Sequence, residues 1–349
     1  MNVFAAAAPA ARTGRPRSLR HGVGLAAAAI TTVSLGACGG GTTTPATAPT
    51  SAAPTSATPA AVASAAPASN SNASATVLTG TRYYLGMTGQ EAVVHAVRGE
   101  VDQVTARIPL GSGHCVRNTI TISPYGERLA WVEGGTGQDS GALVTSMIDG
   151  SRKRTVARAA PFRGKANCLG SNSLVWNSND LLMVQDGRRS VLIDVAANKP
   201  ADGDAGNETL KWWSADGRSW AAVSEGKPYA TDGSGGHFYH YTPPKAEAAH
   251  HDGWRVRSVS MDGRYVSVGW MNTDVSRNDG SFAVVDTTTS KVVKLPVTGE
   301  IKSIQFAADG KVLVRQATRV VVLDTGFRQI GEVAEPQEVQ RMTLLAYVP

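Results

Sequence analysis

One short pattern recurs along this chain and constrains its fold more than any other feature. Its clearest copy is Ser260-Met261-Asp262-Gly263-Arg264, which is followed by the alternating run Tyr265-Val266-Ser267-Val268. Related copies begin at Ser214, Ala307 and Ser123, and a degenerate copy begins at Asn177. Asp-Gly between two apolar runs favours a hairpin, because glycine adopts the positive φ of the turn without steric cost. The chain is therefore predicted to be all-β.

The spacing of these turns indicates how the strands are grouped. The turn glycines or their equivalents fall at 126, about 180, 217, 263 and 310, so the repeat spans roughly 37 to 54 residues. Each copy leads to a second apolar strand that ends in aspartate: Asp149, Asp194, Asp232, Asp286 and Asp324. Several strands in a unit of this length are typical of a propeller blade, which must stack on its neighbours to cover its apolar faces. The alternative is a two-sheet sandwich.

The repeat divides the region after residue 76 into six predicted blades, with a seventh allowed if a long connection contains one. The six blades span about 80–112, 116–160, 168–204, 209–245, 253–298 and 300–335. The apolar run 342–348 is predicted to add a strand to the first blade. Closing the ring with strands from both ends of the domain would remove exposed sheet edges, which otherwise invite aggregation.

The turn motif also resembles that of a known family. Ile122-Ser123-Pro124-Tyr125-Gly126-Glu127-Arg128-Leu129-Ala130-Trp131 is similar to the repeat of TolB-like (WD40-like) β-propellers, which runs roughly S-P-D-G-x-x-[LI]-[AV]-[FWY]. Tyr125 stands where the family has aspartate. The resemblance covers about residues 80–335 and implies a β-propeller. By analogy of fold it also suggests an envelope scaffold or a role associated with translocation.

The first 37 residues are predicted to be an export signal. Four arginines and no acidic residue precede the apolar stretch 23–35, which is short for a bilayer span. The sequence Leu35-Gly36-Ala37-Cys38 then resembles the bacterial lipobox. This resemblance implies cleavage before Cys38 and attachment of diacylglycerol to its sulfur, which predicts an extracytoplasmic protein anchored to the cell membrane by lipid. The alternative is an ordinary secretory signal with a chance cysteine.

The next segment, 38–76, has the composition of a tether. It consists almost wholly of Gly, Thr, Pro, Ala, Ser and Asn and carries no charged residue. Such a segment cannot bury enough apolar surface to offset its conformational entropy, so we expect it to be disordered. The folded propeller domain is accordingly predicted to comprise residues 77–349.

The net charge of +6 overstates the charge of the exported domain. Four of the 34 basic residues and none of the 28 acidic ones lie in the predicted signal, so 30 basic and 28 acidic residues remain after it. This near balance provides no electrostatic footprint for nucleic acid, and we expect no nucleic-acid partner.

The remaining two cysteines, Cys115 and Cys168, predict a disulfide. They form an even pair in an exported domain, and each precedes the innermost strand of one of two adjacent blades. The alternative is two buried free thiols.

A histidine-rich stretch at 237–252 raises the question of a metal site. His237, His240, His250, His251 and Asp252 offer ligand atoms, but strand alternation places His237 and His240 on opposite faces. No metal site is therefore predicted, and the stretch is interpreted as an inter-strand loop on a binding surface. The binding residues predicted from it are His237, Tyr239, His240, Tyr241 and Trp254.

Other candidate features have simpler explanations. The aspartates at the strand ends form a possible acidic ring, but aspartate at such a position more often shapes its turn by accepting backbone hydrogen bonds. The tryptophans, among them Trp212, Trp213, Trp220 and Trp270, are expected to pack between blades, with a sugar-stacking platform as the alternative.

No nucleophile elbow, zinc-binding helix motif or phosphate loop is present in the sequence. The leading hypothesis is therefore a non-enzymatic, lipid-anchored propeller that binds a protein, a peptide or an envelope glycan, and it requires no cofactor and no catalytic residue. The insertions at about 134–141, 235–253 and 272–281 are candidates for its binding face. Two alternatives remain open: a metal-dependent propeller enzyme of the lactonase, cyclotransferase or lyase type, and a sensor or accessory lipoprotein of a membrane complex.

Overall fold

The computed structural model describes residues 77–349 except 112–113, 135–139, 169–172, 187–188, 203–205, 207, 233, 243–250 and 273–280. The described residues all belong to one compact unit, Pro67–Pro349. The predicted signal with Cys38 and the predicted tether lie outside the described residues. Within the described part, no helix combines the length and the apolar character needed to cross a bilayer.

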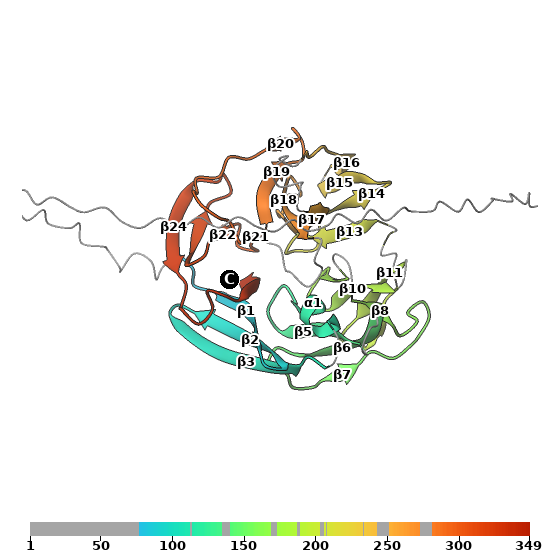
Figure 1. Ribbon diagram of the computed structural model, residues 1–349. Helices are drawn as coiled ribbons and strands as arrows, with labels where there is room; N and C mark the ends of the chain where they lie inside the picture. Colours follow the sequence, from blue (N-terminus) through green and yellow to red (C-terminus); the bar gives the residue numbers. More distant parts are fainter. Residues whose placement is uncertain are drawn as a thin grey trace, which may run out of the picture. The chain divides into compact units, whose positions relative to one another are not determined.

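Six antiparallel sheets surround a common centre (Figure 1). Blade 1 consists of β25 (Thr343–Val348), β1 (Thr81–Thr88), β2 (Glu91–Arg98) and β3 (Val101–Pro109). Blade 2 consists of β4 (Thr121–Ile122), β5 (Arg128–Glu133), β6 (Ser140–Met147) and β7 (Arg154–Thr155), with β8 (Ala166–Asn167) beside β6. Blade 3 consists of β9 (Leu174–Trp176), β10 (Leu181–Asp186), β11 (Arg189–Asp194) and β12 (Lys199–Pro200).

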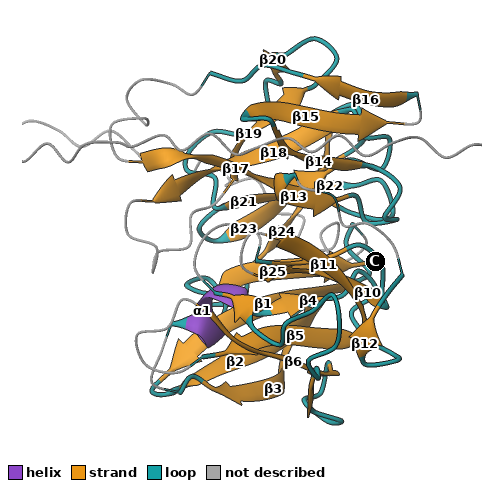
Figure 2. Ribbon diagram, turned by 90° about the vertical axis from the view of Figure 1, so that its right-hand side faces the viewer, coloured by secondary structure: helices purple, strands orange, loops and turns teal. Residues whose placement is uncertain are grey.

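Blade 4 consists of β13 (Thr209–Trp213), β14 (Trp220–Ser224), β15 (Lys227–Asp232) and β16 (Gly235–Phe238). Blade 5 consists of β17 (His251–Val259), β18 (Tyr265–Asn272), β19 (Ser281–Asp286) and β20 (Lys291–Val292). Blade 6 consists of β21 (Ser303–Phe306), β22 (Val312–Arg315), β23 (Arg319–Leu323) and β24 (Gln329–Ala334). One short helix, α1 (Cys115–Thr119), precedes β4 in the described chain (Figure 2). The molecule is an all-β, six-bladed β-propeller, as predicted.

The first blade is completed by the end of the chain. Strand β25 pairs antiparallel with β1, with Thr81 opposite Val348 and Tyr83 opposite Ala346. This pairing confirms the predicted closure of the ring, and it covers the backbone edge that β1 would otherwise expose.

The repeated turn joins the first and second strands of a blade. In four copies the glycine has a φ of +71° to +80°, at Gly126, Gly217, Gly263 and Gly310. Its N–H donates to the carbonyl three residues earlier, as from Gly263 to Ser260 at 2.9 Å. The Ser260 hydroxyl donates to Asp262 and accepts from the Tyr265 N–H at 2.8 Å. The predicted turn chemistry is thus confirmed.

Two of these glycines also allow a neighbouring blade to approach closely. A Cβ at Gly217 would overlap the carbonyl oxygen of Asn177 in the preceding blade, and a Cβ at Gly263 would overlap that of Thr231. The turns therefore require glycine for two separate reasons, the positive φ and the lack of space.

Apolar side chains fill each of the six contacts between neighbouring blades. Separate buried clusters lie between blades 1 and 2, 2 and 3, 3 and 4, 4 and 5, 5 and 6, and 6 and 1. Trp131, Trp176 and Trp213 are 2%, 6% and 8% exposed within them, which confirms the predicted core packing for these three tryptophans. Trp212 and Trp220 are partly buried, and the side chain of Trp270 lies outside the described residues. Each blade is thereby covered by its neighbours, as the repeat architecture requires.

A buried ion pair reinforces the junction between the last blade and the first. The Arg315 guanidinium donates to both carboxylate oxygens of Glu335, and the two side chains are 4% and 0% exposed. Tyr84 of β1 donates its hydroxyl to the same carboxylate at 2.5 Å, and burial raises the pKa of Tyr84. Arg315 also donates to the carbonyls of Val339 and Met342. The pair therefore ties β22, the segment before β25, and β1 together.

We expect Gly263→Ala to destabilise the protein more than Gly226→Ala. Both glycines have positive φ, which costs alanine about 1–2 kcal/mol. Only Gly263 adds the overlap with Thr231, because nothing lies within 4 Å of a Cβ at Gly226, and overpacking costs about 1–3 kcal/mol more. Urea unfolding of the full-length protein would measure both values. Equal losses would show that the close approach between blades does not matter.

Removal of Glu335 should be costly because it leaves the Arg315 charge buried and unpaired. We expect Glu335→Ala to lower the free energy of unfolding by about 3–5 kcal/mol. The matched control is Glu332→Ala, which breaks the half-exposed pair with Arg319 and should cost less than about 1 kcal/mol. Denaturant unfolding measures the free energy of unfolding of both variants. Similar losses would contradict a special role for the buried pair.

Candidate functional site: the central cavity

A cavity of about 740 Å³ lies at the centre of the ring. The innermost strands of all six blades line it, through Thr121, Leu174, Trp212, Arg257, Ile304 and Leu344. Other lining residues belong to the connections that lead into these strands, at 118–120, 300–302 and 340–342. The cavity is therefore at the end of the channel where the innermost strands begin, away from the repeated Asp-Gly turns. Its volume is within the range of ligand-binding pockets.

The charged residues of the described lining are mostly cationic. They comprise five basic side chains and one acidic one: Arg255, Arg257, Lys302, Arg315, Arg341 and Glu300. Glu300 pairs with Lys302 at 2.7 Å, and Arg315 is held by Glu335 behind the cavity wall. Arg255 and Arg257 are half-buried on β17, on either side of the buried Val256.

Uncharged hydrogen-bonding groups are also present in the lining. Ser173 is only 5% exposed, and its hydroxyl has no hydrogen-bond partner within the described structure. The hydroxyl of Ser303 is likewise buried and without a partner there. A buried hydroxyl is rarely left unsatisfied in a folded protein, so these two serines are exceptions within the described structure.

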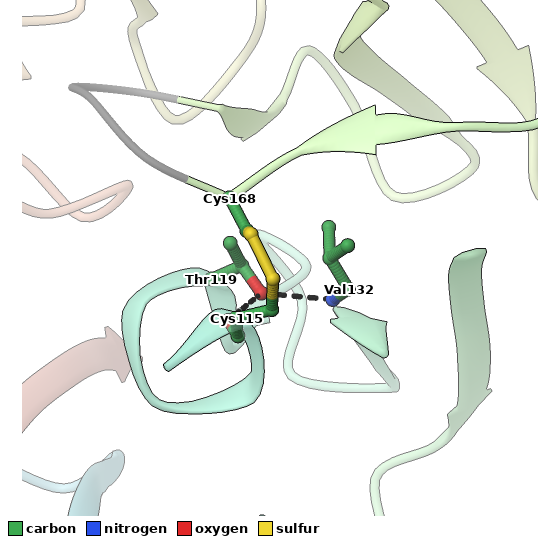
Figure 3. The surroundings of a disulfide bond; sticks show 4 residues. All are labelled: Cys115, Thr119, Val132 and Cys168. Carbon is green, nitrogen blue, oxygen red and sulfur yellow. Dashed lines mark hydrogen bonds between the residues drawn. A yellow bond between two sulfur atoms is a disulfide. The ribbon is translucent and has the colours of Figure 1, made fainter. Parts of the chain in front are cut away.

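The predicted disulfide between Cys115 and Cys168 is present beside this mouth of the channel (Figure 3). The two Cα atoms are 4.7 Å apart, within the usual range for a disulfide. The Thr119 hydroxyl donates to the Cys115 carbonyl at 2.7 Å and accepts from the Val132 N–H at 2.8 Å, which fixes α1 on blade 2. The bond thus joins two segments that line the cavity, one after Cys115 and one after Cys168.

These cysteines also form, with His114, the one group of three potential metal ligands among the described residues. Their sulfur atoms are bonded to each other, so neither is available as a thiolate ligand. With the disulfide formed, the two cysteines of this cluster have a structural role.

The binding residues predicted from the histidine-rich stretch lie elsewhere. Tyr239 and Tyr241 are 5% and 8% exposed in the cluster between blades 4 and 5, where burial raises the pKa of Tyr239. The Tyr241 ring meets Trp254 edge-on, with centroids 5.5 Å apart. His237 Nε2 lies 3.0 Å from the Thr287 hydroxyl, and the exposed His240 contacts Thr242. None of the five belongs to the described cavity lining.

Part of this stretch lies outside the residues that the structure describes. His250 and the side chains of His251 and Asp252 lie outside the described residues, as do most of the other predicted insertions at 134–141 and 272–281.

The aspartates at the strand ends do not form an acidic ring but shape their turns. Each accepts a backbone N–H two to four residues later: Asp149, Asp194, Asp232, Asp286 and Asp324. Arg264 donates two further hydrogen bonds to Asp286 and lowers the pKa of this carboxyl to about 2. The turn-shaping interpretation of these residues is confirmed.

The described lining of the cavity consists of basic, hydroxyl, amide and apolar side chains with one carboxylate. Within its described lining, Glu300 is the only carboxylate and is paired with Lys302, and no histidine or cysteine contributes. General acid–base catalysis requires groups that exchange protons near neutral pH, whereas arginines and hydroxyls supply charge and hydrogen bonds. No motif in the sequence marks Arg255, Arg257, Ser173 or Trp212 as part of a site. The one available signal was their place on or next to an innermost strand.

Loss of the disulfide should loosen the rim of the cavity as well as destabilise the fold. Since the bond joins residues 53 apart, we expect the variant Cys115→Ser with Cys168→Ser to lose about 3–4 kcal/mol of unfolding free energy. Thiol titration of the denatured wild type, with and without reductant, would test the bond itself. Two reactive thiols without reductant would contradict it.

No protein-family model and no curated protein matches the chain. Among solved structures, it is similar to a protein from Agrobacterium tumefaciens provisionally described as TolB, at 15% identity over 67% of this chain and 86% of that one, with a TM-score of 0.36. The β-propeller domain of the Trilobed protease from Pyrococcus furiosus matches at 12% identity over 73% and 86%, with a TM-score of 0.38. The Pan2 WD40 domain of Neurospora crassa matches at 10% identity over 74% and 80%, with a TM-score of 0.40. At this level the likeness concerns the fold alone.

Proposed function

We propose that this chain is a lipid-anchored, extracytoplasmic binding module of the TolB-like type. Its central cavity captures part of a protein, peptide or envelope glycan without chemical conversion. The observation that carries this proposal is the cavity itself, which combines a ligand-sized volume, contributions from all six blades and a cationic lining.

Two features of the sequence support the location. The lipobox at Leu35–Cys38 supplies an anchor, and the uncharged segment 38–76 supplies a tether. At about 3.1 Å per residue in extended polyproline geometry, a tether of this length can reach on the order of 100 Å from the membrane. The propeller is then free to meet a ligand at a distance from the lipid surface.

The proposal is tested by placing a photo-reactive amino acid at one of two exposed positions in the full-length protein in cells. Asn118 lies at the cavity, and Glu225 lies in the turn between β14 and β15, away from it. We expect a cross-linked adduct from Asn118 in the membrane fraction and none from Glu225. In the Cys38→Ser background, the adduct should move out of the membrane fraction.

Two results would count against the proposal separately. Equal adducts from both positions, or none from Asn118, would show that the cavity is not the binding face. An unchanged membrane association of the Cys38→Ser variant would show that Cys38 carries no anchor.

A further inference from the structure

We propose that the dithiol form of this protein binds Zn²⁺ through Cys115, Cys168 and His114. One ligand atom from each of these three residues lies within 4.8 Å of the other two. In the disulfide form the two sulfurs are bonded to each other, so the site exists only while both cysteines are thiols. Cysteines are synthesised as thiols, so this form of the chain precedes the disulfide. The inference is independent of what the central cavity binds.

His114 contributes a ring nitrogen that no other described group uses. Its Nε2 is buried and has no hydrogen-bond partner within the described structure. A buried polar atom without a partner is rare in folded proteins, and a neutral imidazole binds a metal ion through such a nitrogen. The enclosure of this atom agrees with a structural zinc site, in which the ligands close around the metal.

Hydrogen bonds hold both cysteines in place independently of the disulfide. The Thr119 hydroxyl donates to the Cys115 carbonyl and accepts from the Val132 N–H, which fixes α1 on blade 2 (Figure 3). Cys168 directly follows β8, which pairs with β6 of the same blade. The two thiols of the reduced chain therefore stay close and move apart only to non-bonded contact. The ligand atoms of a tetrahedral zinc site are about 3.5–3.8 Å apart, a separation that rotation of the cysteine side chains provides.

The surroundings select zinc among the common metal ions. Both cysteines belong to the apolar cluster between blades 2 and 3, where they are 1% and 0% exposed. Zn²⁺ with two thiolates and a neutral imidazole has no net charge, so it can be buried there at little electrostatic cost. Cu⁺ with the same ligands would leave one negative charge uncompensated. Ca²⁺ and Mg²⁺ prefer oxygen ligands, whereas the three ligand atoms here are two sulfurs and a nitrogen.

Binding moves protons and no electrons. Each thiol releases its proton to solvent as its sulfur bonds to the metal, and His114 enters as the neutral ring. Three protein ligands leave the fourth position of the zinc ion to a water molecule. The zinc form holds α1 and the segment after β8 together, as the disulfide does, and the two forms exclude each other.

The test uses the full-length Cys38→Ser protein, so that Cys115 and Cys168 are its only thiols. The protein is purified with its thiols kept reduced by a phosphine and is titrated without oxygen with Co²⁺, a spectroscopic substitute for Zn²⁺. We expect one Co²⁺ per chain, with thiolate-to-metal charge-transfer absorption and the visible bands of tetrahedral cobalt. Zn²⁺ should displace the cobalt completely, and the disulfide form of the same protein should show none of these signals.

Variants identify the ligands. We expect His114→Ala to weaken Co²⁺ and Zn²⁺ binding at least about tenfold, because even the loss of a group behind a metal ligand costs this much. The matched control is His240→Ala, which removes an exposed histidine outside the cluster and should leave the affinity unchanged. If His114→Ala does not fold, the second measurement uses the reduced Cys38→Ser protein. One equivalent of Zn²⁺ should slow the reaction of its two thiols with a thiol reagent at least about tenfold, since the metal occupies the thiolates.

Several results would overturn the zinc site. They are the absence of stoichiometric Co²⁺ uptake by the reduced protein, uptake without thiolate-to-metal absorption, and equal uptake by the disulfide form. Equal affinities of His114→Ala and His240→Ala would likewise contradict it, because His114 would then not be a ligand. None of these results affects the cross-linking at Asn118, so the zinc site and the proposed function fail or stand separately.

Discussion

The ring depends on the packing of each blade against its neighbours, and at two junctions this packing brings a turn glycine against a backbone carbonyl of the neighbouring blade. Gly217 lies against Asn177 and Gly263 against Thr231, with no space for a side chain between them. A single blade cannot cover its two apolar faces, so this spacing decides whether the clusters between blades close without voids. The aspartates at the strand ends make a separate contribution to the fold. They hold the outer turns with backbone hydrogen bonds and leave the sheet faces apolar.

The fold could be predicted wherever its sequence signal is local and repeated. The Asp-Gly turns recur once in most blades, so the number of blades could be predicted from them. The apolar run at 342–348 predicted the strand that closes the ring. The cavity could not be predicted in the same way, because its lining combines residues that come from all six blades. Arg257 has the local sequence of an ordinary strand residue, and only the closed ring makes it part of a site. The attention given to Tyr239 and Tyr241 came from composition, and their burial follows from packing between blades 4 and 5.

Arg315 belongs both to the buried ion pair and to the lining of the cavity. The residue lines the cavity, yet its charge is balanced by Glu335, and its remaining donors hold the segment before β25. A buried arginine with no counter-charge would be strongly unfavourable. Arg315 therefore contributes to the junction between the last blade and the first as well as to the wall of the cavity. The disulfide has a comparable position on the opposite wall, where it constrains lining segments from blades 2 and 3.

The pairing of β25 with β1 has a consequence for the order of folding. These strands are the last and the first of the described domain, so the first sheet keeps an open edge until the end of the chain arrives. Contacts of such long sequence separation form slowly, because a large loop must close before they contribute. During synthesis, the hairpins of every blade can form locally, but the innermost strand of the first blade is added only when the end of the domain has been made, so the ring closes last.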